Sequence, residues 1–330
     1  MKHIKKKIEN KNIMITGGTG SFGNQIVSKL IKLNPKRIVI FSRDEKKQYD
    51  MKELFKENQD LLDFVIGDVR DYSRVKESMK NIDIVYHAAA LKQVPSCEFH
   101  PFEAVKTNII GAENVRNAAI ENNVNIVVAI STDKAVKPVN VMGMTKAVQE
   151  KIMLSANNGK YSTKFICVRY GNVIGSRGSV IPLFKKKIEE GKYLPLTSFE
   201  MTRFLLTLDE AIDLVFKATF EGEQRQLFVK KMPACYIVDL AKEMSKALTG
   251  KEDYPIREVG IRPGEKIHEV LVSEEEMYRA VETETHYIIY PYGKIKKPRL
   301  IKKIKEYTSN NTHILDRTEL VSLLKKSKWI

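Results

Sequence analysis

The chain is poor in cysteine and has no long apolar run. Its 330 residues include only Cys97, Cys167 and Cys235, which are widely spaced and odd in number. This count argues against both a disulfide framework and a zinc site, and we expect no metal site. No apolar run approaches the roughly 20 residues that span a bilayer, and the first residues lack the apolar stretch of a secretory signal. We therefore expect a cytoplasmic enzyme or binding protein without membrane insertion.

Negative charge is also in deficit. Lysine and arginine outnumber aspartate and glutamate by 56 to 41, which gives a net charge of +15. Such an excess suits nucleic acid, a membrane surface or an anionic small substrate. The sequence shows no interleaved aromatic and basic residues, no helix-turn-helix and no zinc pattern, so we expect no nucleic-acid partner. Scattered, solvated lysines, many of them in 2–11 and 294–305, are the simpler interpretation.

A glycine-rich turn follows the first apolar segment. Residues 13–15 form a short apolar run, a Gly-x-x-Gly-x-x-Gly motif comes directly after it, and apolar residues then recur at helical spacing. Such a turn lets the backbone approach a pyrophosphate at a helix N-terminus, where free N–H groups and the helix dipole favour anions. We therefore expect a dinucleotide to bind against Gly17, Thr19, Gly20, Ser21, Phe22 and Gly23.

The next apolar segment ends where a dinucleotide-binding chain contacts the adenosine ribose, about 20 residues past the last glycine. An acidic residue alone at this place would select NAD through the ribose 2′-hydroxyl. Ser42 and Arg43 instead offer a hydroxyl and a guanidinium to a 2′-phosphate, and Lys47 is within reach if a helix begins here. We predict NADP, and Asp44 leaves NAD as the alternative.

Further apolar segments recur at the spacing of strands that alternate with helices, so that six strands extend to about Arg169. This alternation predicts an α/β fold with a Rossmann-type, doubly wound parallel sheet. Lys92 is expected to contact cofactor or substrate, although a surface lysine is the plainer alternative. The other residues after these strands, or on the helical segment 101–122, that we expect at the cofactor are Asp68, Val69, Ala88, Ala90 and Asn108.

One strand end carries a dense set of acid–base groups. The apolar run 126–130 ends in Ser131-Thr132-Asp133-Lys134, and a loop and a helix that carries Lys146 follow. Hydroxyls, a carboxylate and two amines at the carboxyl end of a parallel strand can support acid–base chemistry. Taken alone, the stretch fits a solvated loop equally well, but the glycine turn upstream favours a catalytic role.

The second half of the chain predicts a smaller C-terminal substrate-binding domain. We place an NADP-binding domain at 1–174 and the substrate-binding domain at 175–330, with part of about 200–245 packing back on the first. A Gly-rich loop at 170–182 and the basic segment 261–266 suit a second ligand. Capping boxes predict helix starts at Thr207 with Glu210, Ser273 with Glu276, and Asp316 with Glu319.

With these segments placed, the chain resembles the extended short-chain dehydrogenase/reductase family over nearly its whole length. Within it, the chain is most similar to inverting UDP-N-acetylglucosamine 4,6-dehydratases of bacterial surface-polysaccharide synthesis, chiefly those of the capsule type. Segment 307–312 resembles the C-terminal latch of the capsule-type members. The other shared segments are Phe41–Glu45, His87–Pro95, Ser131–Ala135, Arg169–Val173, Thr202–Phe204 and Gly264–Lys266.

One residue departs from the wider family. Most members have tyrosine four residues before the helical lysine, where this chain has Met142. A thioether cannot ionise or donate a proton, so the usual Tyr/Lys proton shuttle is absent. A methionine can also simply fill a gap in a pocket wall. Capsule-type dehydratases are similar in having methionine here, so the resemblance implies an active enzyme of that subgroup.

The resemblance implies a dehydration that leaves the cofactor unchanged overall. Hydride moves from sugar C4 to NADP⁺, the C5 proton is removed, the C6 hydroxyl leaves as water, hydride returns to C6, and C5 is inverted. Lys134 is expected to be the C5 base if burial lowers its pKa, and Asp133 the acid for the leaving hydroxyl. Thr132 is expected near the C4 oxygen and Lys146 at the nicotinamide ribose. Lys134 or Lys92 would accept the C4 hydroxyl proton.

The resemblance also implies contacts and an assembly. Asn172, Arg203, Arg262 and Glu265 match positions that line the nucleotide-sugar site of relatives. Relatives assemble as oligomers, often hexamers, so we expect a homo-oligomer that takes a UDP-sugar. Further residues expected at the substrate are Lys92, Thr132, Ser179 and Val180, and Val173 is expected at the cofactor.

Two other functions fit parts of the same pattern. A UDP-sugar 4-epimerase has the same fold and the same first hydride step, but it gives Asp133 and Lys134 no evident role and normally relies on the missing tyrosine. A non-catalytic NADP-sensing protein fits the fold alone, and the Asp133–Lys134 pair with Lys146 argues against it. The exact sugar, the C5 stereochemistry and the pathway stay open at this point.

Overall fold

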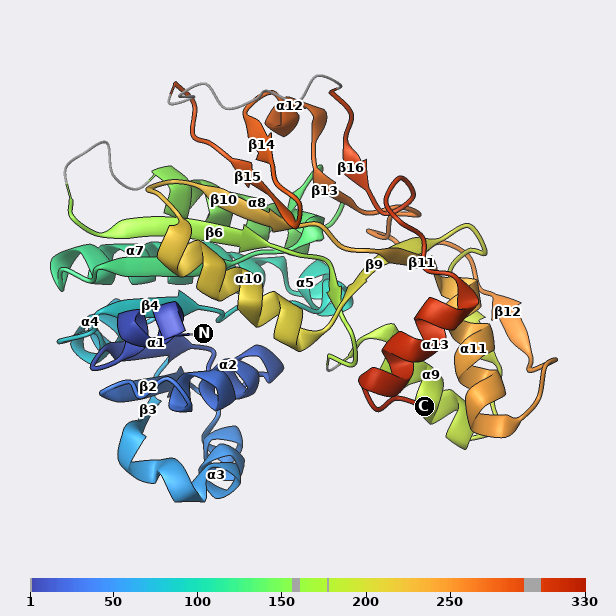
Figure 1. Ribbon diagram of the computed structural model, residues 1–330, viewed down its shortest axis with the longest axis horizontal. Coiled ribbons are helices and arrows are strands. Elements are labelled where there is room, and N and C mark those ends of the chain that lie inside the picture. Colours follow the sequence, from blue (N-terminus) through green and yellow to red (C-terminus); the bar gives the residue numbers. More distant parts are fainter. Residues whose placement is uncertain (1, 156–160, 177, 294–303) are drawn as a thin grey trace.

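The computed structural model describes residues 2–155, 161–176, 178–293 and 304–330. Among them, the central element is a nine-stranded sheet of order β14-β15-β10-β6-β5-β4-β1-β2-β3 (Figure 1). The six strands that come first along the chain all run parallel, which confirms the predicted doubly wound sheet. They are β1 (Asn12–Thr16), β2 (Arg37–Ser42), β3 (Leu62–Ile66), β4 (Ile84–His87), β5 (Ile126–Ile130) and β6 (Lys164–Arg169).

The winding direction of the sheet reverses between β1 and β4. From β1 the chain moves outward through β2 to β3, and it then returns to β4 on the other side of β1. Except for the edge strand β3, these strands are almost entirely buried, as expected for strands covered on both faces. Ligands of such sheets bind at the carboxyl ends of the strands beside this switch point.

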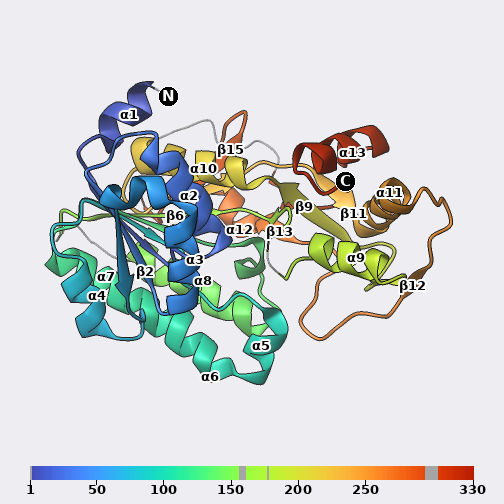
Figure 2. The same ribbon diagram turned by 90° about the horizontal axis from the view of Figure 1, so that it is seen from below.

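Helices cover both faces of the sheet (Figure 2). On one face α2 packs against α10, and on the other α7 packs between α4 and α8. The apolar spacing of α2 places Ile26, Val27 and Leu30 in the core. The helices of this part are α1 (Lys2–Ile8), α2 (Ser21–Ile31), α3 (Glu45–Leu54), α4 (Tyr72–Ser78), α5 (Val94–Phe99), α6 (Pro101–Ala104), α7 (Gly111–Glu121), α8 (Val141–Ser155) and α10 (Leu208–Glu221), with a 3₁₀ helix at Lys56–Leu61.

The predicted helical segment 101–122 is helical throughout but not uniform. Between α6 and α7 it contains a π-helical stretch, Val105–Ile110. Such wide turns are rare and occur frequently at functional sites. Asn108 lies in this stretch.

The sheet takes in strands from the second half of the chain. β10 (Leu227–Lys230) pairs parallel to β6, and β15 (His286–Ile289) and β14 (Ala280–Glu282) then add antiparallel strands. β10 and α10 fall in the region expected to pack back on the first domain. β14 and β15 lie farther along the chain, in the part assigned to the substrate-binding domain, so that part also contributes to the main sheet.

A second hydrophobic core lies at one end of the molecule, where α9, α11 and α13 gather (Figure 1). It includes Phe184, Leu240 and Leu320, one from each of these helices. The predicted boundary at 174/175 stays a prediction. The elements of this end are β7 (Asn172–Val173), α9 (Val180–Glu189), β8 (Leu194–Leu196), β9 (Thr202–Leu206), β11 (Ala234–Tyr236), α11 (Ile237–Thr249), β12 (Ile256–Glu258) and α13 (Arg317–Lys326).

Three short elements connect the sheet with this second core. β13 (Val270–Val272) pairs antiparallel with β16 (Tyr307–Thr308), and α12 (Glu274–Met277) follows β13. All three predicted capping boxes are confirmed, at the starts of α10, α12 and α13. None of the helices in the described ranges is long and apolar enough to cross a membrane. All three cysteines are free and buried.

Candidate active site

The glycine turn between β1 and α2 is shaped by what a side chain would meet there. Gly17 has φ +67°, and a Cβ on it would lie 2.8 Å from the Ala89 backbone after β4. A Cβ on Gly23 would lie 1.9 Å from the Gly18 carbonyl oxygen. The N-cap residue Gly20 offers no side-chain acceptor to the first turn of α2. The turn therefore presents helix N–H groups that suit the phosphates of a dinucleotide.

The end of β2 gathers the residues predicted to contact the adenosine ribose. The Ser42 hydroxyl lies 2.9 Å from that of Thr19. Asp44 caps α3 by accepting from the Lys47 backbone at 3.0 Å, and it also pairs with the Lys47 ammonium. The side-chain bond from Lys47 is the main cause that lowers the pKa of Asp44. This carboxylate is therefore committed to the helix cap, while the Arg43 side chain is 53% exposed.

Asp68, predicted to accept from an adenine amino group, already has protein partners. It pairs with Arg70 at 2.7 Å and with Arg43 at 3.3 Å. Burial would raise the pKa of Asp68, but the bonds from Arg70 outweigh it and the pKa is lowered. A contact with adenine stays a prediction. Val69, beside it, is buried against Gly111 at the start of α7.

Asn108 holds the loop that follows β4. Its side chain accepts from the Leu91 N–H at 2.8 Å and donates to the Leu91 carbonyl at 3.0 Å and to the Thr145 hydroxyl at 2.9 Å. The π-helical stretch thus fixes the position of residues 88–92, which include Ala88, Ala90 and the exposed Lys92. Asn108 acts on the site through this loop, and a direct contact with a cofactor stays a prediction.

Lys146 lies on α8 beneath the end of β5. Its ammonium donates to the Ile130 carbonyl and to the Gln149 side chain, both at 2.7 Å. Burial lowers the pKa of Lys146 to about 8. Met142, one turn earlier, is buried against Cys97 and Ala104 of α5 and α6. The methionine therefore fills an apolar gap at the place where most of the wider family has tyrosine.

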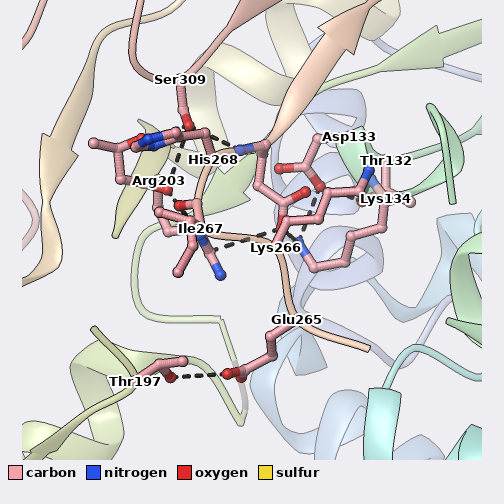
Figure 3. Close-up of polar contacts among 12 residues, drawn as sticks. Thr132, Asp133, Lys134, Thr197, Arg203, Glu265, Lys266, Ile267, His268 and Ser309 are labelled. Carbon is pink, nitrogen blue, oxygen red and sulfur yellow. Dashed lines mark hydrogen bonds and ion pairs between the residues drawn. The ribbon is translucent and has the colours of Figure 1, made fainter. Parts of the chain in front are cut away.

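The strand end after β5 forms a compact acid–base cluster (Figure 3). The Thr132 hydroxyl donates to the Asp133 carboxylate at 2.8 Å, and the Lys134 ammonium lies 3.1 Å from the same oxygen. A second carboxylate belongs to Glu269, the residue directly before β13, and it lies 3.3 Å from the Lys134 ammonium. Asp133 is completely buried and Glu269 is 2% exposed. Thr132, Asp133 and Lys134 are thus brought together as predicted, with an unpredicted fourth member.

The charges of this cluster act on one another. Burial raises the pKa of Asp133 even against the charge of Lys134, so protonating this carboxylate is easier than in water. Burial alone would lower the pKa of Lys134, but Asp133 and Glu269 outweigh it and the pKa is raised. The condition on which Lys134 was expected to be the base, a pKa lowered by burial, is therefore not met, because Asp133 and Glu269 face the ammonium. Burial would raise the pKa of Glu269, but Lys134 and Arg203 outweigh it and the pKa is lowered.

Segment 264–269 joins the two halves of the site. Toward the sheet, Lys266 donates to the Val136 carbonyl at 2.6 Å, and the Asn140 side chain donates to the Gly264 carbonyl at 2.7 Å. Toward the second core, Glu265 accepts from the Thr197 hydroxyl at 2.8 Å (Figure 3). The segment therefore positions Glu265 and Glu269 from one short stretch of chain.

Arg203 on β9 faces this segment. It donates to the Ile267 carbonyl at 3.1 Å, and its Nε lies 3.8 Å from the Glu269 carboxylate. It is thus part of the same polar cluster as Lys134. Arg262, by contrast, is exposed at the start of the turn that leads into segment 264–269.

The entrance to α9 holds buried polar atoms without partners. The side-chain oxygens of Asn172 and Ser179 are buried and have no hydrogen-bond partner among the described residues. Val180 begins α9 directly after Ser179, and Val173 pairs with Leu206 of β9. Unsatisfied buried oxygens usually mark a strained or ligand-binding position. Arg177, in the predicted Gly-rich loop, lies outside the described residues.

Sequence reasoning missed Glu269, because nothing in the residues around it marks an acid–base role. The only local signal is a carboxylate directly before the apolar run 270–272. Sequence reasoning also did not predict the buried network in which Arg169 pairs with Glu150 and Glu276. In the described ranges, no group of three or more His, Cys, Asp or Glu residues is placed to hold a metal ion.

A family model described as "Polysaccharide biosynthesis protein" matches residues 13–291. The chain belongs to this family. Its fold is that of the extended short-chain dehydrogenases/reductases, as the resemblance implied. A UDP-glucose 4-epimerase from Rickettsia conorii is 47% identical, over 96% of this chain and 95% of the relative.

Solved structures of relatives agree with this assignment. The structure of Pen from Bacillus thuringiensis has a TM-score of 0.92 and 39% identity, over 98% of this chain and 99% of that one. DesIV, a dTDP-glucose 4,6-dehydratase from Streptomyces venezuelae solved with NAD, has a TM-score of 0.71 over 78% of this chain and 86% of that one. At 19% identity, DesIV shows the shared fold alone.

Proposed function

We propose that this protein is a nucleotide-sugar 4,6-dehydratase, a hydro-lyase of surface-polysaccharide synthesis that acts on UDP-N-acetylglucosamine with inversion at C5. The observation that carries the proposal is the contact, at 3.1 Å, between the completely buried Asp133, whose pKa burial raises, and the Lys134 side chain. A neutral carboxyl group can donate a proton to a leaving hydroxyl, and an amine can take one from carbon. Elimination of water needs both groups.

The residues around the switch point fit an NADP cofactor. The glycine turn would hold the pyrophosphate, and Lys146 the nicotinamide ribose. Asp44 is engaged in capping α3. Arg43, which is 53% exposed and pairs with Asp68, and Lys47, which pairs with Asp44, would exchange these partners for a ribose 2′-phosphate, and NAD is the less favoured cofactor. When bound, the nicotinamide supplies reversible hydride transfer at the sugar. The neighbour DesIV was solved with NAD, which supports a nicotinamide cofactor in this fold.

The acid–base residues then have separate roles. Asp133 gives its proton to the C6 hydroxyl, which leaves as water, and Lys134 removes the C5 proton. Thr132, which already donates to Asp133, lies on the same strand end and orients the sugar at the C4 oxygen. Met142 has no ionisable group, so it shapes the wall of the pocket and takes no part in proton transfer.

Residues from both halves of the site would bind the UDP-sugar. Arg203 supplies positive charge next to the acid–base cluster, and the exposed Arg262 supplies it near segment 264–269. The unpartnered oxygens of Asn172 and Ser179 would find partners in the ligand. The remaining residues of the proposed binding surface are Lys92, Val180 and Glu265. Assembly into a homo-oligomer stays a prediction.

A UDP-sugar 4-epimerase is the second candidate, because the Rickettsia conorii relative carries that name. An epimerase returns hydride to C4 and eliminates nothing. It would leave the buried Asp133 and the charged Lys134 beside it without a task. The cluster therefore favours the dehydratase.

The product mass separates the two candidates. Purified protein with NADP⁺ is incubated with UDP-N-acetylglucosamine, and the nucleotide sugar is followed by mass spectrometry. The dehydratase gives a product lighter by one water, and an epimerase gives a product of unchanged mass. Asp133→Asn should reduce water loss by about 10²–10⁴-fold, the usual contribution of a general acid, while NADP binding is retained.

A further inference from the structure

Glu269 is the least expected member of the acid–base cluster. It comes from the far side of the site, directly before β13, and one of its oxygens lies 3.3 Å from the Lys134 ammonium. Its other carboxylate oxygen is buried and has no hydrogen-bond partner among the described residues. A buried carboxylate with one oxygen unsatisfied can accept a further proton without breaking an existing bond.

The backbone of Glu269 is held firmly in this position. Its N–H donates to the Ser309 hydroxyl at 2.9 Å, and the Ser309 N–H donates to its carbonyl at 2.9 Å. The Ser309 hydroxyl also lies 2.6 Å from that of Thr202. Since both backbone groups are bonded, the distance between the Glu269 carboxylate and Lys134 is set by the fold.

A charged Lys134 raises a difficulty for the dehydration. An ammonium has no lone pair, so it must lose a proton before it can remove one from C5. Asp133 is completely buried, which is the main cause that raises its pKa, and the proposed function gives it the proton for the leaving hydroxyl. The other charged side chains that act on Lys134 among the described residues are Glu269 and the cations Arg203 and Lys266. Only Glu269 of these can accept a proton.

We propose that Glu269 and Lys134 share one proton and together form the base of this active site. Glu269 takes the ammonium proton when the amine must accept one from the sugar. Because Glu269 acts through Lys134, it is a positioning residue for the catalytic amine. The identity of the sugar proton rests on the proposed function, whereas the shared proton does not.

The proton transfers balance. One proton passes from the Lys134 ammonium to the Glu269 carboxylate, which leaves a neutral amine and a neutral carboxylic acid. The amine lone pair takes the C5 proton, the C5–H electron pair forms the C5–C6 double bond, and the C6–O bond breaks as Asp133 protonates the departing hydroxyl to water. The pair regains its first state when one proton returns to C5. The proton released by the C4 hydroxyl in the first step passes to solvent, and solvent returns one proton to Asp133 after the water has left.

The surroundings make the neutral pair accessible. The charged groups that face Glu269 are Lys134 from the strand end, Arg203 from β9 and Lys266 from its own segment, with Asp133 behind Lys134. Burial costs the ammonium and the carboxylate much of their hydration, and their mutual attraction offsets this cost, so the resting pair is charged and the neutral pair is its minor form. A proton can then move across the 3.3 Å gap without changing the net charge of the site.

Glu269→Gln tests the shared proton through the pH dependence of dehydration. In the wild type, the active and resting forms of the pair hold the same number of protons, so kcat should be flat around neutral pH. The amide cannot accept the proton, and Lys134 must then lose it to solvent. The variant should lose about 10²–10⁴-fold in kcat at neutral pH and regain about tenfold per pH unit as the pH rises. Glu269→Asp should restore part of the flat profile.

A control and a contrary result complete this test. Glu282→Gln removes a carboxylate that pairs with Lys231 outside the cluster, and it should keep the flat profile. A Glu269→Gln variant that is uniformly slower at every pH would show a structural role and overturn the proposal. So would a variant with wild-type rates.

A second measurement needs no turnover. NMR of protein labelled with ¹³C-lysine follows the protonation of Lys134, with Lys134→Arg to assign its signal. The shared proton predicts that the pKa of Lys134 falls by one or more in Glu269→Gln, and an unchanged pKa would overturn it. If the wild type converts no nucleotide sugar, the proposed function fails, and this titration still decides whether the Glu269 charge acts on the Lys134 proton, on which the shared proton depends.

Discussion

Arg169 supports the floor of the active site through a buried network of ion pairs and hydrogen bonds. The guanidinium is 2% exposed and lies 2.6 Å from Glu150 of α8 and 2.9 Å from Glu276 of α12. It also donates to the Leu271 carbonyl at 2.8 Å. Glu150 accepts in addition from the hydroxyl of Ser131, next to the catalytic strand end. One side chain thus ties together β6, α8 and the β13–α12 segment.

Replacing Arg169 by methionine should be strongly destabilising. The change leaves two buried carboxylates without their cation, and breaking a buried pair in this way costs about 3–5 kcal/mol. The matched control is Arg37→Met, because Arg37 and its partner Asp63 are 42% and 43% exposed. Such a surface pair contributes about 0–1 kcal/mol. The free energy of unfolding is measured for each variant by urea denaturation of the cofactor-free protein.

Two further results follow from the same reasoning. The triple variant Arg169→Met/Glu150→Gln/Glu276→Gln should recover much of the loss, because no buried charge is left unpaired. The pKa of Glu276 is lowered in the folded protein, since Arg169 outweighs burial. Its ion pair therefore stabilises above a pH of about 4.5 and is lost as the pH falls, so the deficit of Arg169→Met should shrink in acid. An Arg169→Met cost no larger than that of Arg37→Met would refute the account.

Two other predictions concern the cofactor site. Since burial lowers the pKa of Lys146 to about 8 from 10.5, the unfolded chain binds more protons between these values, and the stability of the cofactor-free protein should rise with pH across that range. The full effect on the free energy of unfolding is about 3 kcal/mol and should vanish in Lys146→Met. Urea denaturation of the wild type and of this variant measures it, and an equal pH dependence in the two would contradict the burial argument. Arg43→Ala should weaken NADP binding about tenfold or more, measured by fluorescence titration, and leave NAD binding unchanged. An equal loss of affinity for NADP and NAD would show that Arg43 does not bind the 2′-phosphate.

Features encoded in neighbouring residues were predictable from the sequence. The glycine turn and the capping boxes are local patterns, and the structure confirms both, including the box at Ser273 and Glu276. The alternation of strands and helices similarly predicted the parallel part of the sheet. The addition of β14 and β15 was not predictable, because antiparallel pairing at a sheet edge depends on contacts between distant segments.

The active site shows the same division. Thr132, Asp133 and Lys134 adjoin in the sequence, and their mutual contacts follow from one strand end. The direction of the Lys134 pKa could not be predicted from the sequence, because it depends on Glu269, which the fold brings from a distant segment. Electrostatics of a site built from several segments therefore requires the structure.

The central claim is that the Asp133–Lys134 cluster removes and returns a proton at C5 while water leaves from C6. Its most direct test is the conversion of UDP-N-acetylglucosamine in D₂O with NADP⁺, followed by mass spectrometry and NMR of the product at early times. The account predicts a product that has lost one water and carries one solvent deuterium at C5. A product of unchanged mass formula, with no deuterium bound to carbon, would contradict it and establish the 4-epimerase instead.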